Sequence, residues 1–294
     1  MKRTPDLPPM MDRRLRRRGL LGSIVAGASS FAMSPLQAQQ ISVIALLHLA
    51  PRPGSLEYNM RLIERAVSQA ASLGARLIVT PELCLSGYGF RNLIGTSWIA
   101  GEQPARLAWA ARLVRHTNGA SVVLGQPEAD GEALFNSMVV FAPDGGVSGR
   151  HRKIAVLRVG SESWSSPGDR ATVVDISGIG RIGLFVCADM HSKRLVGETA
   201  AQGCDLMLSA AAWAPGEHGP SGEWEWASRT TRRPVLVCNR TGRDVLDFSG
   251  ARSVAAVDGT IAFAHAARED GIVLVDWMPA TRSLTNWRSV SLAV

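Results

Sequence analysis

Residues 41–80 read ISVIALLHLAPRPGSLEYNMRLIERAVSQAASLGARLIVT, and this stretch decides the fold class. It opens with the almost wholly apolar run Ile41–Leu49, which is typical of a strand buried on both faces. Apolar residues then recur at helical spacing over Ser55–Leu73, and Gly74 ends that helix. A second apolar run, Arg76–Thr80, follows at once. Strand, helix and strand within about 40 residues form a βαβ unit, which predicts an α/β fold.

The same alternation continues along the chain. Further helices are predicted over Pro104–His116, Lys193–Gly203 and Gly222–Thr231. Strands are predicted over Ser121–Gly125, Leu134–Ala142, Val147–Ile154, Ala171–Ile176, Arg181–Cys187, Asp205–Ser209 and Pro234–Cys238, with a hairpin over Ala251–Ala264. No linker or repeat interrupts this pattern, so residues 39–294 are expected to form a single domain that mixes βαβ units with hairpins.

The composition is that of a folded globular protein, with 294 residues of which 46% are hydrophobic and 19% charged. The formal net charge of +7 is unevenly distributed. Residues 1–38 hold seven basic and two acidic side chains, which leaves a net charge of only +2 for the remainder. Because the remainder has no long basic run interleaved with aromatic residues, nucleic-acid binding by a broad basic face is not expected.

Residues 1–38 have the pattern of an export signal. Arg17-Arg18 precedes a weakly hydrophobic run that reaches Met33, and the small residue Ala38 stands where a signal peptidase would cut. Paired arginines are typical of the bacterial twin-arginine route. A membrane anchor is the alternative, but spanning needs roughly 20 apolar residues and this run is shorter and rich in glycine. We therefore expect a cleaved signal, no stable membrane anchor, and an exported chain, periplasmic or secreted, that starts near Gln39.

Signals for cofactors and metals are weak. The sequence Gly178-Ile179-Gly180-Arg181-Ile182-Gly183 matches the dinucleotide fingerprint, but a strand follows it instead of a helix, so a hairpin turn is predicted. The six histidines are scattered without a paired-ligand spacing, so neither a metal nor a cofactor is expected. Cys84, Cys187, Cys204 and Cys238 are expected to be free thiols, because a chain of this size does not need disulfides for stability.

Three polar residues follow apolar strands, namely Glu82, Lys153 and Cys187. Each has a structural explanation when taken singly: a surface carboxylate, a member of the solvated cluster Arg150–Lys153, and a small buried hydrophobic residue. Ligands of open α/β sheets gather at the carboxyl ends of the strands. A base can take the proton of a thiol, and a cation can stabilise the charge that develops on an attacked carbonyl. Together the three side chains can therefore supply base, cation and nucleophile.

The surrounding residues add a family resemblance. Ala75–Tyr88 resembles the glutamate motif of the nitrilase superfamily of carbon–nitrogen hydrolases, and His151–Ile154 resembles its lysine motif. Leu184–Asp189 resembles its cysteine motif, which Gly203–Ser209 continues at the usual distance. Further landmarks in the same order are Ala212-Trp213, Asn239–Gly242, Phe248–Gly250 and Asp258-Gly259, so the resemblance covers residues 41–277.

The resemblance implies a four-layer α-β-β-α sandwich that assembles into a homodimer or a larger homo-oligomer. It also implies that Cys187 is the nucleophile, Glu82 the general base, and Lys153 the oxyanion stabiliser, helped by the backbone N–H of Ala188. Many members of the family carry a second active-site glutamate ahead of a Pro-Gly pair, and Glu162 is the candidate here.

Four large side chains near these motifs, with Ala188, are predicted to bind the substrate: Tyr88, Trp164, Met190 and Trp213. Such side chains are also common in cores. The chain departs from the family pattern after Asp189, where an aromatic residue, a proline and a glutamate are common and Met190–Arg194 stands instead. Ala155 replaces a frequent histidine. These departures leave the subfamily open.

The resemblance implies hydrolysis of a non-peptide C–N bond through a thioester on the cysteine. The burial of Glu82 is expected to hold its pKa near the working pH, so that it can act first as base and then as acid. Three hypotheses follow: an amidase that converts a small amide or N-carbamoyl compound to an acid and ammonia, a nitrilase that hydrolyses an organic nitrile, and an inactive binding homologue. The retention of Glu82, Lys153 and Cys187 favours an enzyme.

Overall fold

The computed structural model describes residues 41–157, 160–216 and 219–293, which lie in one compact unit. The predicted signal peptide, residues 1–38, and the predicted start of the exported chain at Gln39 lie outside the described residues. Within the described part of the chain, no helix is both long enough and apolar enough to cross a membrane.

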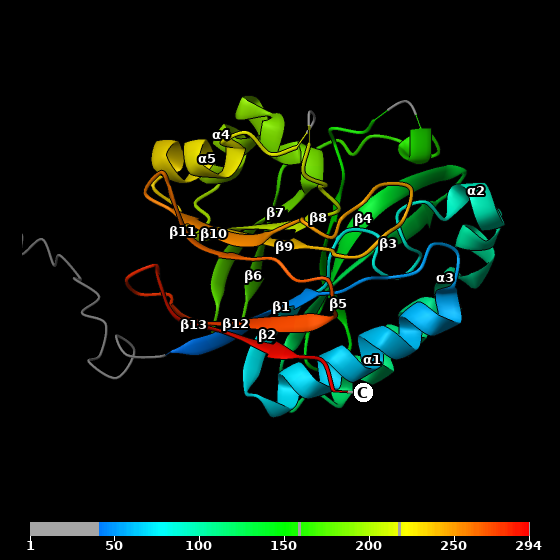
Figure 1. The fold of residues 1–294 in the computed structure, drawn as a ribbon, viewed down its shortest axis with the longest axis horizontal. Helices are drawn as coiled ribbons and strands as arrows, with labels where there is room; N and C mark the ends of the chain where they lie inside the picture. Colours follow the sequence, from blue (N-terminus) through cyan, green and yellow to red (C-terminus); the bar gives the residue numbers. More distant parts are fainter. Residues whose placement is uncertain (1–40, 158–159, 217–218, 294) are drawn as a thin grey trace, which may run out of the picture. The chain divides into compact units, whose positions relative to one another are not determined.

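Two β-sheets stack face to face (Figure 1). The first has seven strands in the order β13-β12-β1-β2-β3-β4-β5, namely β13 (Ser283–Ser291), β12 (Gly271–Met278), β1 (Ser42–His48), β2 (Ala75–Val79), β3 (Ser121–Asp130), β4 (Ala133–Phe141) and β5 (Val147–Arg152). The second has six strands in the order β11-β10-β9-β8-β7-β6, namely β11 (Thr260–His265), β10 (Ser253–Val257), β9 (Val235–Asn239), β8 (Leu206–Ala211), β7 (Gly180–Val186) and β6 (Thr172–Ile176). Both sheets are mixed, with parallel strands at their centres.

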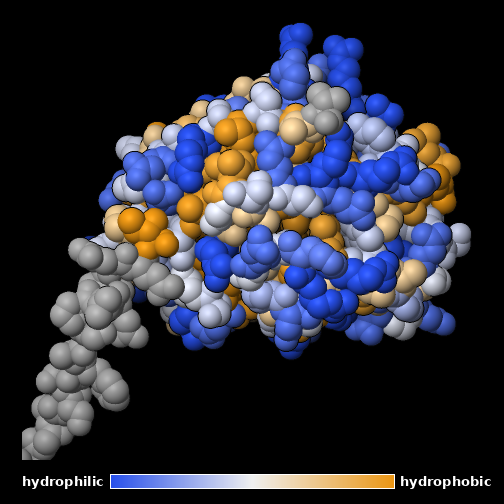
Figure 2. Space-filling view, turned by 90° about the horizontal axis from the view of Figure 1, so that it is seen from below, coloured by the Kyte–Doolittle hydropathy of each residue, from blue (hydrophilic) through white to orange (hydrophobic). Residues whose placement is uncertain are grey.

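Helices cover the outer face of each sheet. The five α-helices of the described residues are α1 (Leu56–Ser72), α2 (Arg91–Ile94), α3 (Trp98–Arg115), α4 (Lys193–Ala201) and α5 (Glu223–Thr231). In Figure 1, α1 and α3 lie against the seven-stranded sheet, and α4 and α5 against the six-stranded sheet. Seen from the side of α1, the surface is mainly hydrophilic with smaller apolar areas between the polar side chains (Figure 2). The predicted four-layer α-β-β-α sandwich is confirmed.

The opening βαβ unit forms as predicted. The strands β1 and β2 pair in parallel, and α1 buries one apolar face against them. That face also contains Asn59, which is fully buried. Its side chain accepts a hydrogen bond from the backbone N–H of Arg52 at 2.8 Å and donates one to the carbonyl of Leu85 at 3.0 Å. Asn59 therefore ties the segment that follows β2 to the start of α1.

Besides the short helix α2 and the continuation of β3 to Asp130, neither of which was predicted, two larger features differ from the sequence-based expectations. No element was predicted after Ala264, but β12 lies beside β1 inside the seven-stranded sheet, with β13 outside it. The helix α3 begins at Trp98 instead of Pro104, so the proline lies inside it. The buried guanidinium of Arg106 donates to the carbonyl of Ile99 at 2.8 Å, which stabilises the helical turn preceding the proline.

The glycine-rich segment that matches the dinucleotide fingerprint is a hairpin turn, as predicted. The strands β6 and β7 are antiparallel, with Ile176 opposite Gly180. Gly178 and Gly180 have φ angles of 74° and 104°, a region that favours glycine. No helix follows the third glycine, Gly183, which lies within β7.

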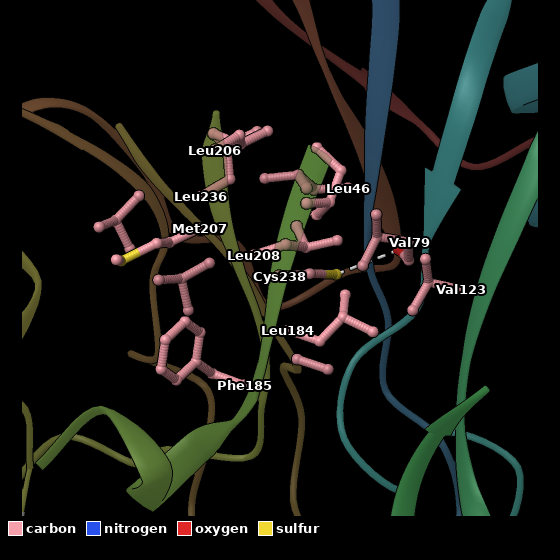
Figure 3. Close-up of a cluster of buried hydrophobic side chains, with 14 of the residues drawn as sticks. Leu46, Val79, Val123, Leu184, Phe185, Leu206, Met207, Leu208, Leu236 and Cys238 are labelled. Atoms are coloured by element: carbon pink, nitrogen blue, oxygen red, sulfur yellow. Dashed lines mark hydrogen bonds between the residues drawn. The ribbon is translucent and has the colours of Figure 1, made fainter. Parts of the chain in front are cut away.

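The main core fills the space between the two sheets (Figure 3). Leu46 and Val79 of the seven-stranded sheet face Leu184 and Leu208 of the six-stranded sheet, and all four side chains are fully or almost fully buried. The thiol of Cys238 lies in the same layer and donates to the carbonyl of Val79 at 3.2 Å. Hydrophobic burial therefore docks the sheets, and the carbonyls of Leu47 and Val79 across the interface satisfy a buried thiol.

A buried histidine makes folding sensitive to pH. The His48 ring has no exposed surface; its Nδ1 lies 3.0 Å from Ser253 Oγ, and its centroid lies 5.1 Å from that of His265. Burial, together with the neighbouring His265, lowers the pKa of His48 to about 4. The unfolded chain therefore binds the His48 proton at higher pH than the folded chain does, and stability falls as the pH drops below about 6.5.

We expect the free energy of unfolding to decrease by about 2 kcal/mol between pH 7 and pH 5 through His48. Urea unfolding at the two pH values measures it. The His48→Gln variant should lose less stability over this interval than the wild type, whereas His116→Gln, at an exposed histidine, should behave like the wild type. An equal loss in His48→Gln and wild type would contradict this assignment.

Candidate active site

A buried lysine with two carboxylates forms the centre of the site. Lys153 follows β5 at the end of the seven-stranded sheet, and its side chain is 1% exposed. Its Nζ donates to Glu82 Oε1 at 2.8 Å and also donates to Glu162 Oε1. Glu82 follows β2, and Glu162 ends a 3₁₀ turn at Gly160–Glu162. A carboxylate 71 residues before Lys153 and another nine residues after it therefore meet at one ammonium group.

Asn136, in the middle of β4, joins the same cluster. Its Nδ2 donates to Glu82 Oε1 at 2.7 Å and to Glu162 Oε1 at 3.1 Å. Its backbone carbonyl accepts from the backbone N–H of Lys153 at 2.8 Å. The second oxygen of Glu82 accepts from the backbone N–H of Ala212 at 2.8 Å. Because Ala212 follows β8, this bond connects the candidate base to the six-stranded sheet.

Close backbone packing fixes the segments that carry Glu82 and Lys153. Gly125 of β3 lies so near the turn after β2 that a Cβ there would lie 2.2 Å from the carbonyl oxygen of Pro81. Gly168, of the Pro-Gly pair, donates its N–H to the carbonyl of Lys153 at 2.7 Å, and a Cβ there would lie 2.2 Å from the Arg152 carbonyl oxygen. Both positions require glycine because any side chain would push the chain segments apart.

The charges of the cluster are strongly coupled. Burial opposes the charge on Lys153, but the carboxylates of Glu82 and Glu162 outweigh burial and raise its pKa well above the ordinary value. Burial and the nearby Glu82 raise the pKa of Glu162 to about 7, against the effect of Lys153. Burial also acts on Glu82, but Lys153 and hydrogen bonds outweigh it and lower its pKa.

The expectation that burial holds the pKa of Glu82 near the working pH is therefore wrong for the resting site. The attraction of Lys153 for the Glu82 carboxylate exceeds the effect of burial, and Glu162 is the carboxyl group that titrates near neutrality. At neutral pH Lys153 is thus cationic and Glu82 is ionised, and the Glu82 carboxylate can accept a proton.

Cys187 lies in a turn with a strained backbone. It follows β7, begins a 3₁₀ turn at Cys187–His191, and has a φ angle of 45°, which is uncommon for a residue with a side chain. Burial, followed by the negative charge of Glu82, raises the pKa of its thiol well above the ordinary value. The thiol is consequently protonated at neutral pH, and it needs a base in order to act as a nucleophile.

Asp189 holds this turn against the segment that carries Lys153. One oxygen accepts from the backbone N–H groups of Ile154 and Ala155 at 2.9 and 2.8 Å. The other lies 2.9 Å from the N–H of Val186 and 2.9 Å from Nε2 of the buried His151. Burial opposes the Asp189 charge, but these hydrogen bonds lower its pKa. Asp189 therefore fixes the turn at Cys187–His191 relative to the segment that carries Lys153.

A cavity of about 630 Å³ opens above these groups. Lys153, Cys187 and Ala188 lie at its wall. Other lining residues come from the segments after β2, β8 and β9 and from a position just beyond Lys153; they include Tyr88, Leu157, Ala212, Trp213, Pro215 and Leu246. A volume of this size suits a small-molecule substrate.

The structure brings most of the predicted site residues together. Tyr88, Ala188 and Trp213 line the cavity beside Lys153 and Cys187. Met190 lies elsewhere: it is 1% exposed, packs in the hydrophobic core, and borders a separate small cavity beside the start of α5. Trp164 also lies outside the cavity lining and packs edge-on against Phe90, with ring centroids 5.1 Å apart.

Sequence reasoning missed Asn136, Leu157, His191 and Leu246. The sequence does contain an indication of Asn136, because Asn136-Ser137 is a polar pair inside the otherwise apolar strand Ala133–Phe141. Leu157 and Leu246 lie in loops and His191 ends the short 3₁₀ turn, and in neither setting does a periodic pattern indicate the direction of a side chain. Among the described residues, no group of three or more histidine, cysteine or acidic side chains could hold a metal ion.

Comparison with known proteins shows the family of the chain. Residues 43–285 match the family model described as carbon-nitrogen hydrolase. The glutamine-dependent NAD(+) synthetase of Xanthomonas campestris is 28% identical over 235 residues, which make up 76% of this chain and 42% of the synthetase. The nitrilase of Pyrococcus abyssi is 28% identical over 169 residues, which make up 57% of this chain and 64% of the nitrilase. The chain thus spans less than two thirds of the length of either relative.

The fold is also found in a solved structure. A mutant of an amidase from Nesterenkonia sp. AN1, with the acetamide moiety of fluoroacetamide covalently added at its active-site cysteine, superposes with a TM-score of 0.73. The two proteins are 25% identical, and the match covers 82% of this chain and 92% of the amidase. This likeness agrees with the family match over residues 43–285. The chain belongs to the carbon-nitrogen hydrolase family, within the nitrilase superfamily.

Proposed function

We propose that the chain is an amidase that hydrolyses a small carboxamide through a thioester on Cys187. One observation carries the proposal: the buried Lys153, hydrogen-bonded to Glu82 and Glu162, shares the wall of one cavity with Cys187. A base, a cation and a thiol are the groups that acyl transfer to a cysteine requires. The covalent adduct at the active-site cysteine of the similar Nesterenkonia amidase supports the same role for Cys187.

In the first half of the reaction, ionised Glu82 takes the thiol proton of Cys187 as the sulfur attacks the amide carbon. The developing oxyanion is stabilised by Lys153, two of whose three N–H donors already bind Glu82 and Glu162, and by the backbone N–H of Ala188. Glu82 then returns the proton to the nitrogen, the C–N bond breaks, and ammonia leaves a thioester on Cys187.

In the second half, Glu82 takes a proton from water as the oxygen attacks the thioester carbon. The C–S bond breaks, the carboxylic acid leaves, and the proton passes from Glu82 back to the sulfur. Glu82 can serve in both directions because it remains hydrogen-bonded to Lys153, Asn136 and Ala212, which keep its carboxylate in place. We assign Glu162 the role of holding Lys153 from the other side.

Ammonia release tests this function. Purified enzyme should release ammonia from members of a panel of aliphatic amides, N-carbamoyl amino acids and nitriles, and Cys187→Ala should release none. Iodoacetamide should label Cys187 in the folded enzyme and spare the core thiols of Cys84, Cys204 and Cys238, all three of which are fully buried. Unfolded enzyme, the control, should be labelled at all four thiols.

A nitrile as the best substrate would favour the nitrilase alternative, because the same thioester chemistry serves both reactions. No release from any compound, together with an unlabelled Cys187 in the folded enzyme, would contradict the catalytic function and favour the inactive binding homologue.

We also propose that the protein is exported, with residues 1–38 removed, and that it acts as a homodimer or larger homo-oligomer. The twin arginines of the N-terminal segment and the resemblance to oligomeric family members support these proposals. The intact mass of the protein from the periplasm or medium, and its sedimentation, would test them. A chain that still begins at Met1, or a monomer at micromolar concentration, would contradict them.

A further inference from the structure

We propose that the enzyme selects uncharged carboxamides with a bulky apolar acyl group and discriminates against acyl groups that end in a carboxylate. This inference rests on the proposed amidase function and concerns the same cavity. It follows from three observations: the size and walls of the cavity, the charges that line it, and the anchoring of its rim.

The cavity is large and has apolar walls. Its volume of about 630 Å³ leaves space beyond the atoms of a simple amide group. Above Cys187 the walls come from Tyr88, Leu157, Trp213 and Leu246. Each methylene that a substrate buries against such walls contributes about 0.8 kcal/mol, equivalent to about four-fold in binding. A longer acyl chain should therefore react with higher kcat/KM until the cavity is filled.

The charges at the cavity do not favour a second anion. Among the described lining residues, the side chains that can carry a positive charge are Lys153 and His191. Lys153 already binds the carboxylates of Glu82 and Glu162. The ring of His191 packs on Trp213 with centroids 4.7 Å apart, and its Nδ1 lies 3.2 Å from the Glu223 carboxylate. A substrate carboxylate would lose water and meet cations that are already neutralised.

The rim of the cavity is held by buried hydrogen bonds, so it can be altered without loss of its shape. Asp244 accepts from the backbone N–H groups of Tyr88 and Gly89, both at 2.9 Å, and forms a fully buried ion pair with Arg240. Two residues later, the Leu246 side chain is 51% exposed. Leu246 is therefore a position at which a charge can be introduced into the wall while the backbone stays anchored.

Two amides of equal length test the proposal: hexanamide and adipic acid monoamide, which differ by the terminal carboxylate. We expect kcat/KM to rise about four-fold per methylene from propanamide to hexanamide. We expect the monoamide to react about 100-fold more slowly than hexanamide. Equal rates for the two, or a best substrate that carries a carboxylate, would overturn the proposal.

A pair of variants separates charge in the cavity wall from charge nearby. Leu246→Arg should raise the rate ratio of adipic acid monoamide to hexanamide about ten-fold. Val245→Arg introduces the same charge at the adjacent residue, which is 47% exposed and outside the lining, and should leave the ratio unchanged. Equal changes in both variants would overturn the assignment of Leu246 to the acyl site. Ammonia release that Cys187→Ala retains would instead contradict the proposed amidase function.

Discussion

Replacing Glu82 by glutamine is expected to lower kcat/KM for amide hydrolysis by at least about 1,000-fold while the protein stays folded. The amide of glutamine has nearly the shape of the carboxylate, and its oxygen can still accept from Lys153 or from the N–H of Ala212. It cannot take a proton, however. Burial keeps the pKa of the Cys187 thiol well above its ordinary value, so without a base very little thiolate forms at neutral pH.

The measurement is ammonia release with the best amide, together with thermal unfolding followed by circular dichroism. Glu128→Gln is the matched control, since Glu128 is also a buried carboxylate but bonds to Arg150, Arg152 and Ser137 outside the cavity lining. It should retain activity within about ten-fold of the wild type. A Glu82→Gln enzyme with activity in that same range would show that the base lies elsewhere.

Replacing Lys153 by methionine is expected both to abolish activity and to destabilise the fold by about 3–5 kcal/mol. The substitution leaves the carboxyl groups of Glu82 and Glu162, both essentially without exposed surface, directed at one point without a cation. Their pKa values then rise above those of the unfolded chain. The folded variant therefore binds more protons than the unfolded chain, and its stability falls as the pH rises above about 4.5.

Urea unfolding at pH 5 and pH 7.5 measures this effect, and the loss relative to wild type should be larger at pH 7.5. The double variant Lys153→Met/Glu162→Gln removes one of the two carboxylates. It should regain much of the stability but none of the activity, which separates folding from catalysis. A single Lys153→Met variant within about 1 kcal/mol of the wild type at both pH values would contradict the account of the buried charges.

The sequence predicted those parts of the fold and the site that depend on a local pattern of residues. The alternation of apolar strands and amphipathic helices predicted the layers, and the polar residues after strands predicted Glu82, Lys153 and Cys187, of which Lys153 hydrogen-bonds Glu82 and shares the cavity wall with Cys187. The position of β12 depends on pairing with β1, more than 220 residues away in the chain, and no local pattern specifies such a partner. The apolar run Ile272–Val275 could have indicated the strand, but not its neighbour.

The sequence also did not predict the direction in which some side chains point. Met190 comes three residues after Cys187, and in the 3₁₀ turn that position points into the core instead of the cavity. Asn136 contacts both carboxylates from the middle of a strand, where sequence alone does not show which face a polar residue occupies. The pKa of Glu82 depends on the Lys153 ammonium at hydrogen-bonding distance, which is a property of the assembled site.

The hydrogen bond from Ala212 to Glu82 has a consequence for the order of folding. Glu82 follows a strand of one sheet, and Ala212 follows a strand of the other. Asp189 likewise joins the turn at Cys187–His191, which follows the six-stranded sheet, to the segment after Lys153, which follows the seven-stranded sheet. Neither sheet contains the complete set of groups by itself. With the proposed amidase mechanism, ammonia release during refolding should therefore recover only after the two sheets have docked. An ammonia assay would then time the docking of the sheets, whereas circular dichroism also reports secondary structure that forms earlier.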